Sequence, residues 1–365
     1  MTLGATLVGR KEVSYSILER TENYLKAVNF ENPEWIPCRV SLMPATWRKY
    51  REALEEVVLR HPKIFPDYKK GSINFDAIAD PGYKRGRFTD SWGCVWENVE
   101  EGLEGMVVVH PLKDWKNLES YIPPDPLIQG ERGRPADWER LREVFREKKL
   151  NGELASGGLP HGFMYMRLYY LRGFENLMID IATDEPRLEK LIDMVLDYNI
   201  KFIEKWIEVG ADLIHFGDDL GNQDRLPISP EKFRKYLKPC YKKMFSLCQK
   251  NNVYVYFHSD GHILEIIDDL IDCGVDILNP QVGANTIDGL VETAKSKVCI
   301  DLDLDRQLFP FAKPQEIREH IREAVEKLNS PRGGLMLIAE CEPDVPLENI
   351  ETICTVLEEI GGPSI

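Results

Sequence analysis

The chain has 365 residues, which is long for one compact domain but suits a (β/α)8 barrel with insertions. Its formal net charge of −15 argues against a general nucleic-acid-binding protein, because such proteins carry a basic surface. Hydrophobic residues make up 43% of the chain, an ordinary globular share, and no apolar stretch approaches the roughly 18 residues of a transmembrane helix.

The eight cysteines are scattered along the chain, and none of them forms a Cys-x-x-Cys pair. This pattern favours a reduced protein in which most thiols are small core residues. The amino terminus lacks the basic and then apolar segments of a signal peptide. We therefore expect a cytoplasmic protein.

The first 150 residues predict helices and one insertion. Residues 13–30 and 45–62 have helical periodicity, and a charged helix is expected near 136–149. Residues 71–112 are rich in glycine and aromatic residues and alternate in hydrophobicity. This alternation predicts an antiparallel hairpin inserted beside the mouth of a barrel.

From about residue 153 onward, predicted strands alternate with predicted helices. Strands are expected at 153–158, 212–216, 253–258, 275–279, 297–301 and 334–339, and helices at 173–182, 186–209, 230–251, 262–272, 286–295, 314–328 and 346–360. Such alternation is typical of an α/β fold with a parallel sheet. The chain shows no internal repeat or low-complexity linker, so we expect one domain over 1–365, with the core β/α units in 151–365.

Polar residues end several of these strands, where α/β folds collect their chemistry. His258 and Cys341 end two apolar runs, and Asp260 follows His258 by two positions. Imidazole, carboxylate and thiolate groups at two strand ends predict an open zinc site. The alternatives are a hydrogen-bonded structural histidine and a core thiol.

Two further strand ends offer candidates. Asp218 and Asp219 follow the strand at 212–216 and could bind a substrate or a metal, or could cap a helix. Asn279 and Gln281 end the strand at 275–279 with neutral donors and acceptors that suit substrate orientation. The aromatic segment 161–170 could line an apolar pocket or belong to the core, and the aromatic residues near 163–170 and 92–96 could enclose a ring.

A set of motifs in this chain resembles the uroporphyrinogen decarboxylase superfamily. The motifs are Gly217-Asp-Asp-Leu-Gly221, Ile228-Ser-Pro-Glu231, Tyr236-Leu-Lys-Pro239, His258-Ser-Asp-Gly-His262, Gly274-Val-Asp-Ile-Leu-Asn-Pro-Gln281, Gly333-Gly334 and Val345-Pro-Leu-Glu-Asn-Ile350. They span roughly 205–355. The resemblance implies a single (β/α)8 TIM-type barrel, here with an N-terminal helical extension and the hairpin insertion.

The superfamily has two chemistries. Its decarboxylases hold the substrate carboxylates with an arginine-rich segment, whereas the equivalent region here, 37–47, contains Arg39 alone. Its corrinoid-dependent methyltransferases hold zinc with His-x-Cys and a distant cysteine. His258 and Cys341 match that pattern, and Asp260 replaces the first cysteine. A zinc ion with fewer thiolate ligands is harder, and this favours oxygen over thiolate as the substrate atom that it binds.

The resemblance therefore implies a zinc-dependent methyltransferase of the demethylating type. It would move a methyl group from an oxygen-bound donor, foremost a methoxylated aromatic compound, to the Co(I) of a corrinoid (cobalamin) on a partner protein. The expected metal ligands are His258, Asp260 and Cys341, with Glu340 as a substitute; Asp218, Asp219 and Asn279 would orient the donor, and Phe163, Tyr165, Trp92 and Gln281 would bind it.

The partner is expected because the chain has no Asp-x-His-x-x-Gly corrinoid motif of its own. A homodimer is a further expectation for the assembly. Three alternatives stay open at this point: a metal-free decarboxylase or lyase, a methylcorrinoid-to-thiol methyltransferase, and a non-catalytic corrinoid-binding or regulatory barrel.

Overall fold

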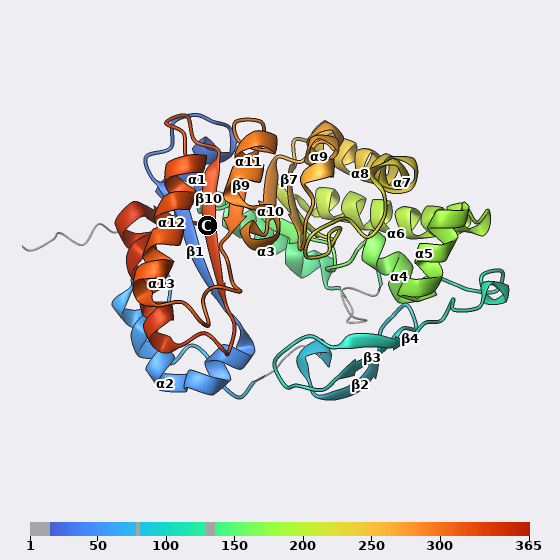
Figure 1. Cartoon of the computed structure of the whole chain (residues 1–365), viewed down its shortest axis with the longest axis horizontal. Coiled ribbons are helices and arrows are strands. Elements are labelled where there is room, and N and C mark those ends of the chain that lie inside the picture. Colours follow the sequence, from blue (N-terminus) through green and yellow to red (C-terminus); the bar gives the residue numbers. More distant parts are fainter. Residues whose placement is uncertain (1–14, 78–80, 129–135) are drawn as a thin grey trace, which may run out of the picture.

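A computed structural model of the chain describes residues 15–77, 81–128 and 136–365. Its centre is a curled sheet of eight strands in the order β11-β1-β10-β9-β8-β7-β6-β5, all paired in parallel (Figure 1). The strands are β1 (Ile36–Leu42), β5 (Ser156–Gly158), β6 (Leu213–Gly217), β7 (Tyr254–Ser259), β8 (Ile277–Pro280), β9 (Cys299–Asp303), β10 (Leu335–Cys341) and β11 (Gly361–Pro363). In the described part of the chain, β5 and β11 do not pair with each other, so hydrogen bonds do not close the curl.

Helices surround this sheet (Figure 1). They are α1 (Ile17–Val28), α2 (Pro44–Arg60), α3 (Trp138–Leu150), α4 (Tyr165–Arg172), α5 (Phe174–Thr183), α6 (Arg187–Val209), α7 (Pro230–Lys232), α8 (Lys238–Lys250), α9 (Ile267–Cys273), α10 (Val282–Asn285), α11 (Ile287–Thr293), α12 (Pro314–Leu328) and α13 (Leu347–Ile360). A π-helical turn covers Phe233–Leu237, and 3-10 turns cover Pro81–Tyr83, Trp115–Asn117 and Leu264–Ile266.

The longest helix, α6, illustrates why these segments are helical. Its buried residues recur at intervals of three and four, as in Leu188, Leu191, Ile192 and Val195, which gives one apolar stripe facing the sheet. The helix ends at Gly210, whose φ of 98° is a left-handed conformation that glycine adopts without strain.

Side chains alternate across β10 between two environments. Leu335, Leu337, Ala339 and Cys341 belong to the hydrophobic core outside the barrel, whereas Ile338 and Glu340 face the cavity inside it. This alternation follows from the two-residue period of a strand. At the end of β10, the even-numbered Glu340 therefore reaches the barrel mouth and the odd-numbered Cys341 does not.

The small antiparallel sheet is separate from the barrel. It consists of β2 (Gly86–Thr89), β3 (Val95–Asn98) and β4 (Met106–Val109) in the order β2-β3-β4. Figure 1 places it below the barrel strands. The Asp90 carboxylate fixes the turn between β2 and β3 by accepting hydrogen bonds from the Trp92 and Cys94 amides and from the Trp96 indole.

The predicted TIM-type α/β barrel, its N-terminal helix and its hairpin insertion are confirmed. The six predicted strands match β5 to β10 with ends shifted by up to three residues. The prediction missed β1 and β11, and the predicted hairpin is a three-stranded sheet. No helix within the described ranges has the length and apolarity to cross a bilayer.

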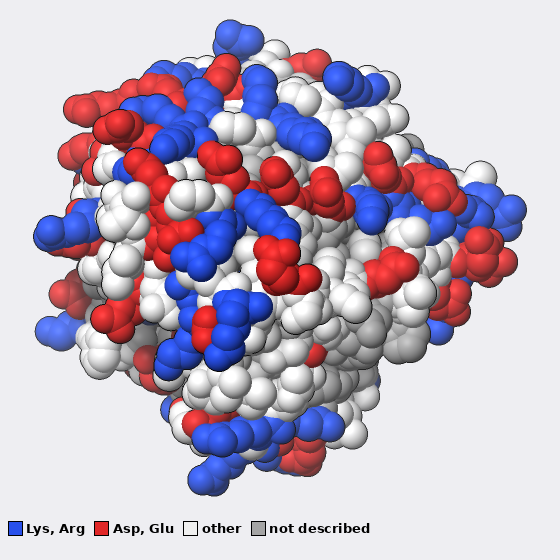
Figure 2. Space-filling view, turned by 90° about the vertical axis from the view of Figure 1, so that its right-hand side faces the viewer, with Lys and Arg blue, Asp and Glu red and all other residues white. Residues whose placement is uncertain are grey.

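Acidic and basic side chains are interspersed on the face drawn in Figure 2.

Candidate metal centre

A cavity of about 1040 Å³ opens at the carboxyl ends of the barrel strands. Its floor is polar and comes from the ends of β6, β7, β8, β9 and β10. Its opposite wall is largely apolar and comes from the small sheet and from α4 and α5. The wall residues are Trp96, Leu103, Met106, Val107, Met166, Tyr169, Tyr170 and Phe174.

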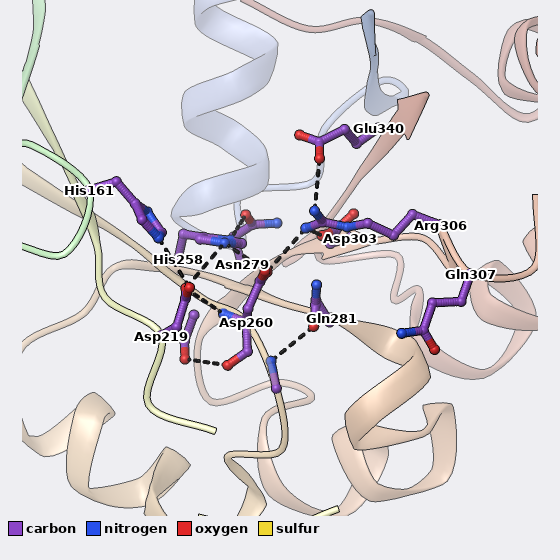
Figure 3. Close-up of polar contacts among 12 residues, drawn as sticks. His161, Asp219, His258, Asp260, Asn279, Gln281, Asp303, Arg306, Gln307 and Glu340 are labelled. Carbon is purple, nitrogen blue, oxygen red and sulfur yellow. Dashed lines mark hydrogen bonds and ion pairs between the residues drawn. The ribbon is translucent and has the colours of Figure 1, made fainter. Parts of the chain in front are cut away.

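Three side chains on the floor converge. Asp219, His258 and Asp260 each offer one ligand atom, and these atoms lie within 4.8 Å of one another (Figure 3). The Nε2 atom of His258 is 3.0 Å from Asp260 Oδ1 and 4.0 Å from Asp219 Oδ1. Asp219 follows β6, and the other two residues lie at the end of β7.

Each of these three residues is oriented by a further side chain. His161 Nε2 lies 3.2 Å from Asp219 Oδ2, and Arg306 Nη2 donates to Asp260 Oδ1 at 3.1 Å. Such outer contacts are typical of metal sites, where they fix the direction of the ligand atoms.

The orientation of His258 follows from Asn279. The amide nitrogen of Asn279 donates to the Asp301 carbonyl, so its Oδ1 is the atom that lies 2.7 Å from His258 Nδ1. An amide oxygen only accepts, so His258 Nδ1 carries the hydrogen. The second nitrogen, Nε2, is therefore turned toward the two carboxylates.

β6 also makes room for the site. It ends at Gly217, and a Cβ atom there would lie 2.5 Å from His161 Nδ1. The missing side chain lets the His161 ring pack against the backbone of β6 and reach Asp219.

The electrostatics of the floor favour a cation. Burial acts to lower the pKa of His258, but the hydrogen bond to Asp260 and the charges of Asp219 and Asp303 outweigh it and raise that pKa to about 9. Burial raises the pKa of Asp303 to about 6. Without a metal ion the imidazole is therefore protonated, and its charge stands where a bound cation would neutralise the carboxylates.

This donor set fits a divalent transition metal. One imidazole nitrogen and two carboxylate oxygens are three protein ligands, the number that catalytic zinc sites use while keeping one position open. Imidazole suits zinc and its first-row neighbours, whereas carboxylates also suit harder ions such as Mn²⁺.

The structure brings together part of the predicted ligand set. His258 and Asp260 meet as predicted, but Cys341 does not join them, because it lies on the outer face of β10 with no exposed surface. Burial raises the pKa of its thiol far above the usual value, which disfavours the thiolate. Glu340 faces the cavity, where its carboxylate accepts from Arg306 Nη1 at 2.7 Å.

The two neighbouring acids after β6 have different positions. Asp219 lies in the cavity, whereas Asp218 is fully buried. The carboxylate of Asp218 accepts hydrogen bonds from the amides of Tyr165 and Met166 at the start of α4 and from the Tyr241 hydroxyl. The structure thus places Asp218, predicted as catalytic, at the beginning of a helix and away from the cavity.

The predicted donor-binding residues also lie elsewhere. Phe163 and Tyr165 are core residues with 2% of their surface exposed, and Trp92 packs under the Arg167 guanidinium. Gln281 lines an adjacent chamber of about 500 Å³ and accepts from the Gly261 amide at 2.9 Å. Of the predicted aromatic segments, Trp96, Tyr169 and Tyr170 reach the cavity instead.

The prediction missed two functional candidates, His161 and Arg306. His161 follows the end of β5 by three residues, so the strand-end argument that selected His258 applies to it as well. Arg306 follows β9 by three residues and is recognisable only once three separate strand ends are brought together.

The comparison with known proteins agrees with the fold. The chain matches the family model of uroporphyrinogen decarboxylase (URO-D) over residues 104–360, which is more than half of its length. The chain therefore belongs to the URO-D family. No curated protein sequence gives a significant match.

Among solved structures, a methyltransferase from Methanosarcina mazei is similar over 94% of this chain and 99% of its own, with 22% identity and a TM-score of 0.63. A B12-independent methionine synthase from Shewanella sp. W3-18-1 is more distant, with 11% identity over 62% of this chain and 66% of its own and a TM-score of 0.41. At 22% identity, the first likeness establishes the fold.

Proposed function

We propose that this protein is a metal-dependent methyltransferase that moves a methyl group from an oxygen-bound donor, a methoxylated aromatic compound, to the Co(I) of a corrinoid carried by a partner protein. The observation that carries the proposal is the group of Asp219, His258 and Asp260, whose ligand atoms lie within 4.8 Å of one another. Each member has its own orienting contact, and the group faces a cavity with an aromatic wall. Zinc is the metal that we favour, because three protein ligands with one open position are its usual catalytic arrangement.

In this proposal, the residues of the floor bind the metal ion and those of the wall bind the donor. On the floor, Asn279 presents His258 Nε2 to the centre of the site, and His161 holds the Asp219 carboxylate. A divalent ion bound there would polarise the donor oxygen and make it a better leaving group. The electron pair of Co(I) on the partner would displace the methyl group from this oxygen, and the released phenolate would take up a proton.

The wall suits a flat apolar donor. The rings of Trp96 and Tyr170 are 4.9 Å apart, those of Tyr169 and Tyr170 are 4.8 Å apart, and those of Tyr169 and Phe174 are 5.7 Å apart. These rings pack edge to face with one another, and the apolar surface that they form would bind an aromatic donor and exclude water from the reacting oxygen.

The nucleophile has to come from outside the chain. An alkyl ether reacts only with a strong nucleophile, and thiolate is the strongest that a protein side chain offers. All eight cysteines are buried, and none of them lines the cavity. A reduced corrinoid supplies the missing nucleophile, because cofactors carry chemistry that side chains lack.

The charges of the cavity weigh against decarboxylation of a polycarboxylate. Six acids line it, namely Glu104, Asp219, Asp260, Asp303, Glu340 and Glu342. Its two arginines, Arg39 and Arg306, are both paired with carboxylates of the protein. A porphyrinogen with several carboxylates would meet repulsion here instead of a cationic clamp.

Two measurements test the proposal. Protein purified without chelator should hold about one zinc per chain, and His258→Ala should lose it, whereas the matched control His262→Ala, a neighbouring histidine that contacts the Ala284 carbonyl, should keep it.

Zinc-loaded enzyme, Co(I) cobalamin and a panel of methoxylated aromatics should then give the free phenol, followed by the loss of the Co(I) spectrum. Persistence of Co(I) across the whole panel would contradict the proposal.

A further inference from the structure

Arg306 lies at the centre of a second group of acids beside the proposed metal ligands. Its guanidinium donates to Asp260 Oδ1 at 3.1 Å, to Asp303 Oδ2 at 2.5 Å and to Glu340 Oε1 at 2.7 Å (Figure 3). These carboxylates follow or end three different strands, β7, β9 and β10. The Arg306 side chain is 20% exposed, so the contacts are largely shielded from water.

The Asp260 carboxylate faces two cationic positions at once. Its Oδ1 atom is 3.0 Å from His258 Nε2 on one side and 3.1 Å from Arg306 Nη2 on the other. A carboxylate that serves two cations is the arrangement found in centres with two metal ions, where the ions lie about 3.5–4 Å apart. In this protein one of the two positions is filled by a side chain.

The hydrogen bonding of Arg306 is incomplete. Asp303 has 4% of its side chain exposed, yet its Oδ1 makes no hydrogen bond with any described residue, and neither does Arg306 Nε. A buried carboxylate oxygen without a donor is costly. The three carboxylates around Arg306, including the unpaired Asp303 Oδ1, form a set of oxygen ligands that would also suit a hard divalent ion such as Mn²⁺.

We propose that Arg306 takes the place of a second metal ion and so limits the centre to one. This inference rests on the proposed metal centre and adds a specificity determinant to it. Arg306 is a positioning residue: it holds Asp260 toward His258, and it holds Glu340 apart from the Asp219–His258–Asp260 group. Removal of its charge leaves Asp303 and Glu340 without a counter-ion and frees them as ligands.

The test is metal stoichiometry in Arg306→Met, which keeps much of the aliphatic stem and removes the guanidinium. Metal-free protein would be equilibrated with Mn²⁺ alone, and bound ions would be counted by equilibrium dialysis. We expect one Mn²⁺ per chain in the wild type and two in Arg306→Met. Electron paramagnetic resonance of the variant should show a magnetically coupled pair.

Two controls separate the second position from general loss of charge. Arg306→Met combined with Glu340→Gln should return to one ion per chain, because it removes a ligand of the second position only. Arg225→Met removes an arginine that pairs with Asp224 at the surface, and should keep one ion. A role of Arg306 in folding alone would lower the number of bound ions and could not raise it.

The outcomes are distinguishable. One ion in both the wild type and Arg306→Met would overturn this inference and leave the proposed centre in place. No ion in either protein would overturn both. An ion in Arg306→Met alone would support the role of Arg306 as a cation substitute and overturn the proposed wild-type centre. A circular dichroism melt of each variant identifies any that fail to fold, and for those Arg306→Gln replaces Arg306→Met in the same count.

Discussion

Replacement of Asp218 by alanine should destabilise the protein, whereas the same replacement of Asp219 should remove the metal. The two acids are adjacent in the sequence but have different partners. Asp218 accepts hydrogen bonds from the Tyr165 amide at 2.5 Å, the Met166 amide at 2.8 Å and the Tyr241 hydroxyl at 2.7 Å. Asp219 faces the cavity beside His258.

The expected size of the effect follows from these bonds. Burial raises the pKa of Asp218 to about 6, so the group is still mainly ionised at pH 7 and depends on its three donors. Each buried donor left without a partner costs about 1–3 kcal/mol, and water entering the space recovers part of that, so we expect a loss of about 4 kcal/mol. An unfolding entropy of about 2.1 cal/mol/K per residue over 365 residues converts this loss into a fall in Tm of about 5 °C.

The assay is a thermal melt followed by circular dichroism, with zinc content measured on the same samples. Asp218→Ala should melt about 5 °C lower, and its metal content should stay at the wild-type value at a temperature where it is folded. Tyr241→Phe removes one donor and should show roughly a third of the effect. Asp219→Ala should lose zinc with little change in Tm. Unchanged stability of Asp218→Ala together with loss of its metal would refute this assignment of the two acids.

Three further predictions concern other residues. Cys341→Ser should keep its zinc, because the thiol lies in the core outside the barrel; loss of metal would restore the thiolate as a ligand. Gly217→Ala should weaken zinc binding by about 10-fold or more, as loss of an outer contact commonly does, because its Cβ would meet His161 Nδ1 at 2.5 Å; a titration with a competing chelator measures this, and an unchanged Kd would count against it. Burial lowers the pKa of His61, but the hydrogen bond and charge of Glu358 outweigh it, so the net shift is upward. Its contribution to stability is therefore complete below about pH 6.5 and is lost as the pH rises through the raised value, and the fall in Tm between about pH 6 and 9 should be smaller in His61→Gln; identical pH profiles would contradict this.

The sequence was most informative about where strands end. Apolar runs such as 253–258 and 334–339 were recognisable because the strands of a parallel sheet are buried on both faces. Because both faces of such a strand are apolar, the sequence does not show which of two neighbouring residues at its end faces the cavity. The choice between Glu340 and Cys341, and between Asp219 and Asp218, therefore required the structure.

Other parts of the site had weak local signals. β5 is three residues long and contains two glycines, so its end is a weaker marker of a functional position than the apolar run before His258. β11 reads Gly-Gly-Pro, a composition typical of turns, and is a strand only because it pairs with the start of β1. Arg306 gains its partners from three strand ends that are distant in sequence.

The small sheet supplies much of the apolar wall of the cavity, whereas the floor comes from the ends of the barrel strands. Half of the wall residues are therefore encoded between β1 and β5 and the other half in α4 and α5, whereas the proposed metal ligands lie in the later stretch from the end of β6 to just after β7. Mutations in the wall can therefore change the shape of the cavity without altering the residues proposed to hold the ion. If the proposed function is correct, this separation would allow substrate range to diverge while the metal centre is kept, and residues 86–109 are the segment to exchange in order to change the donor.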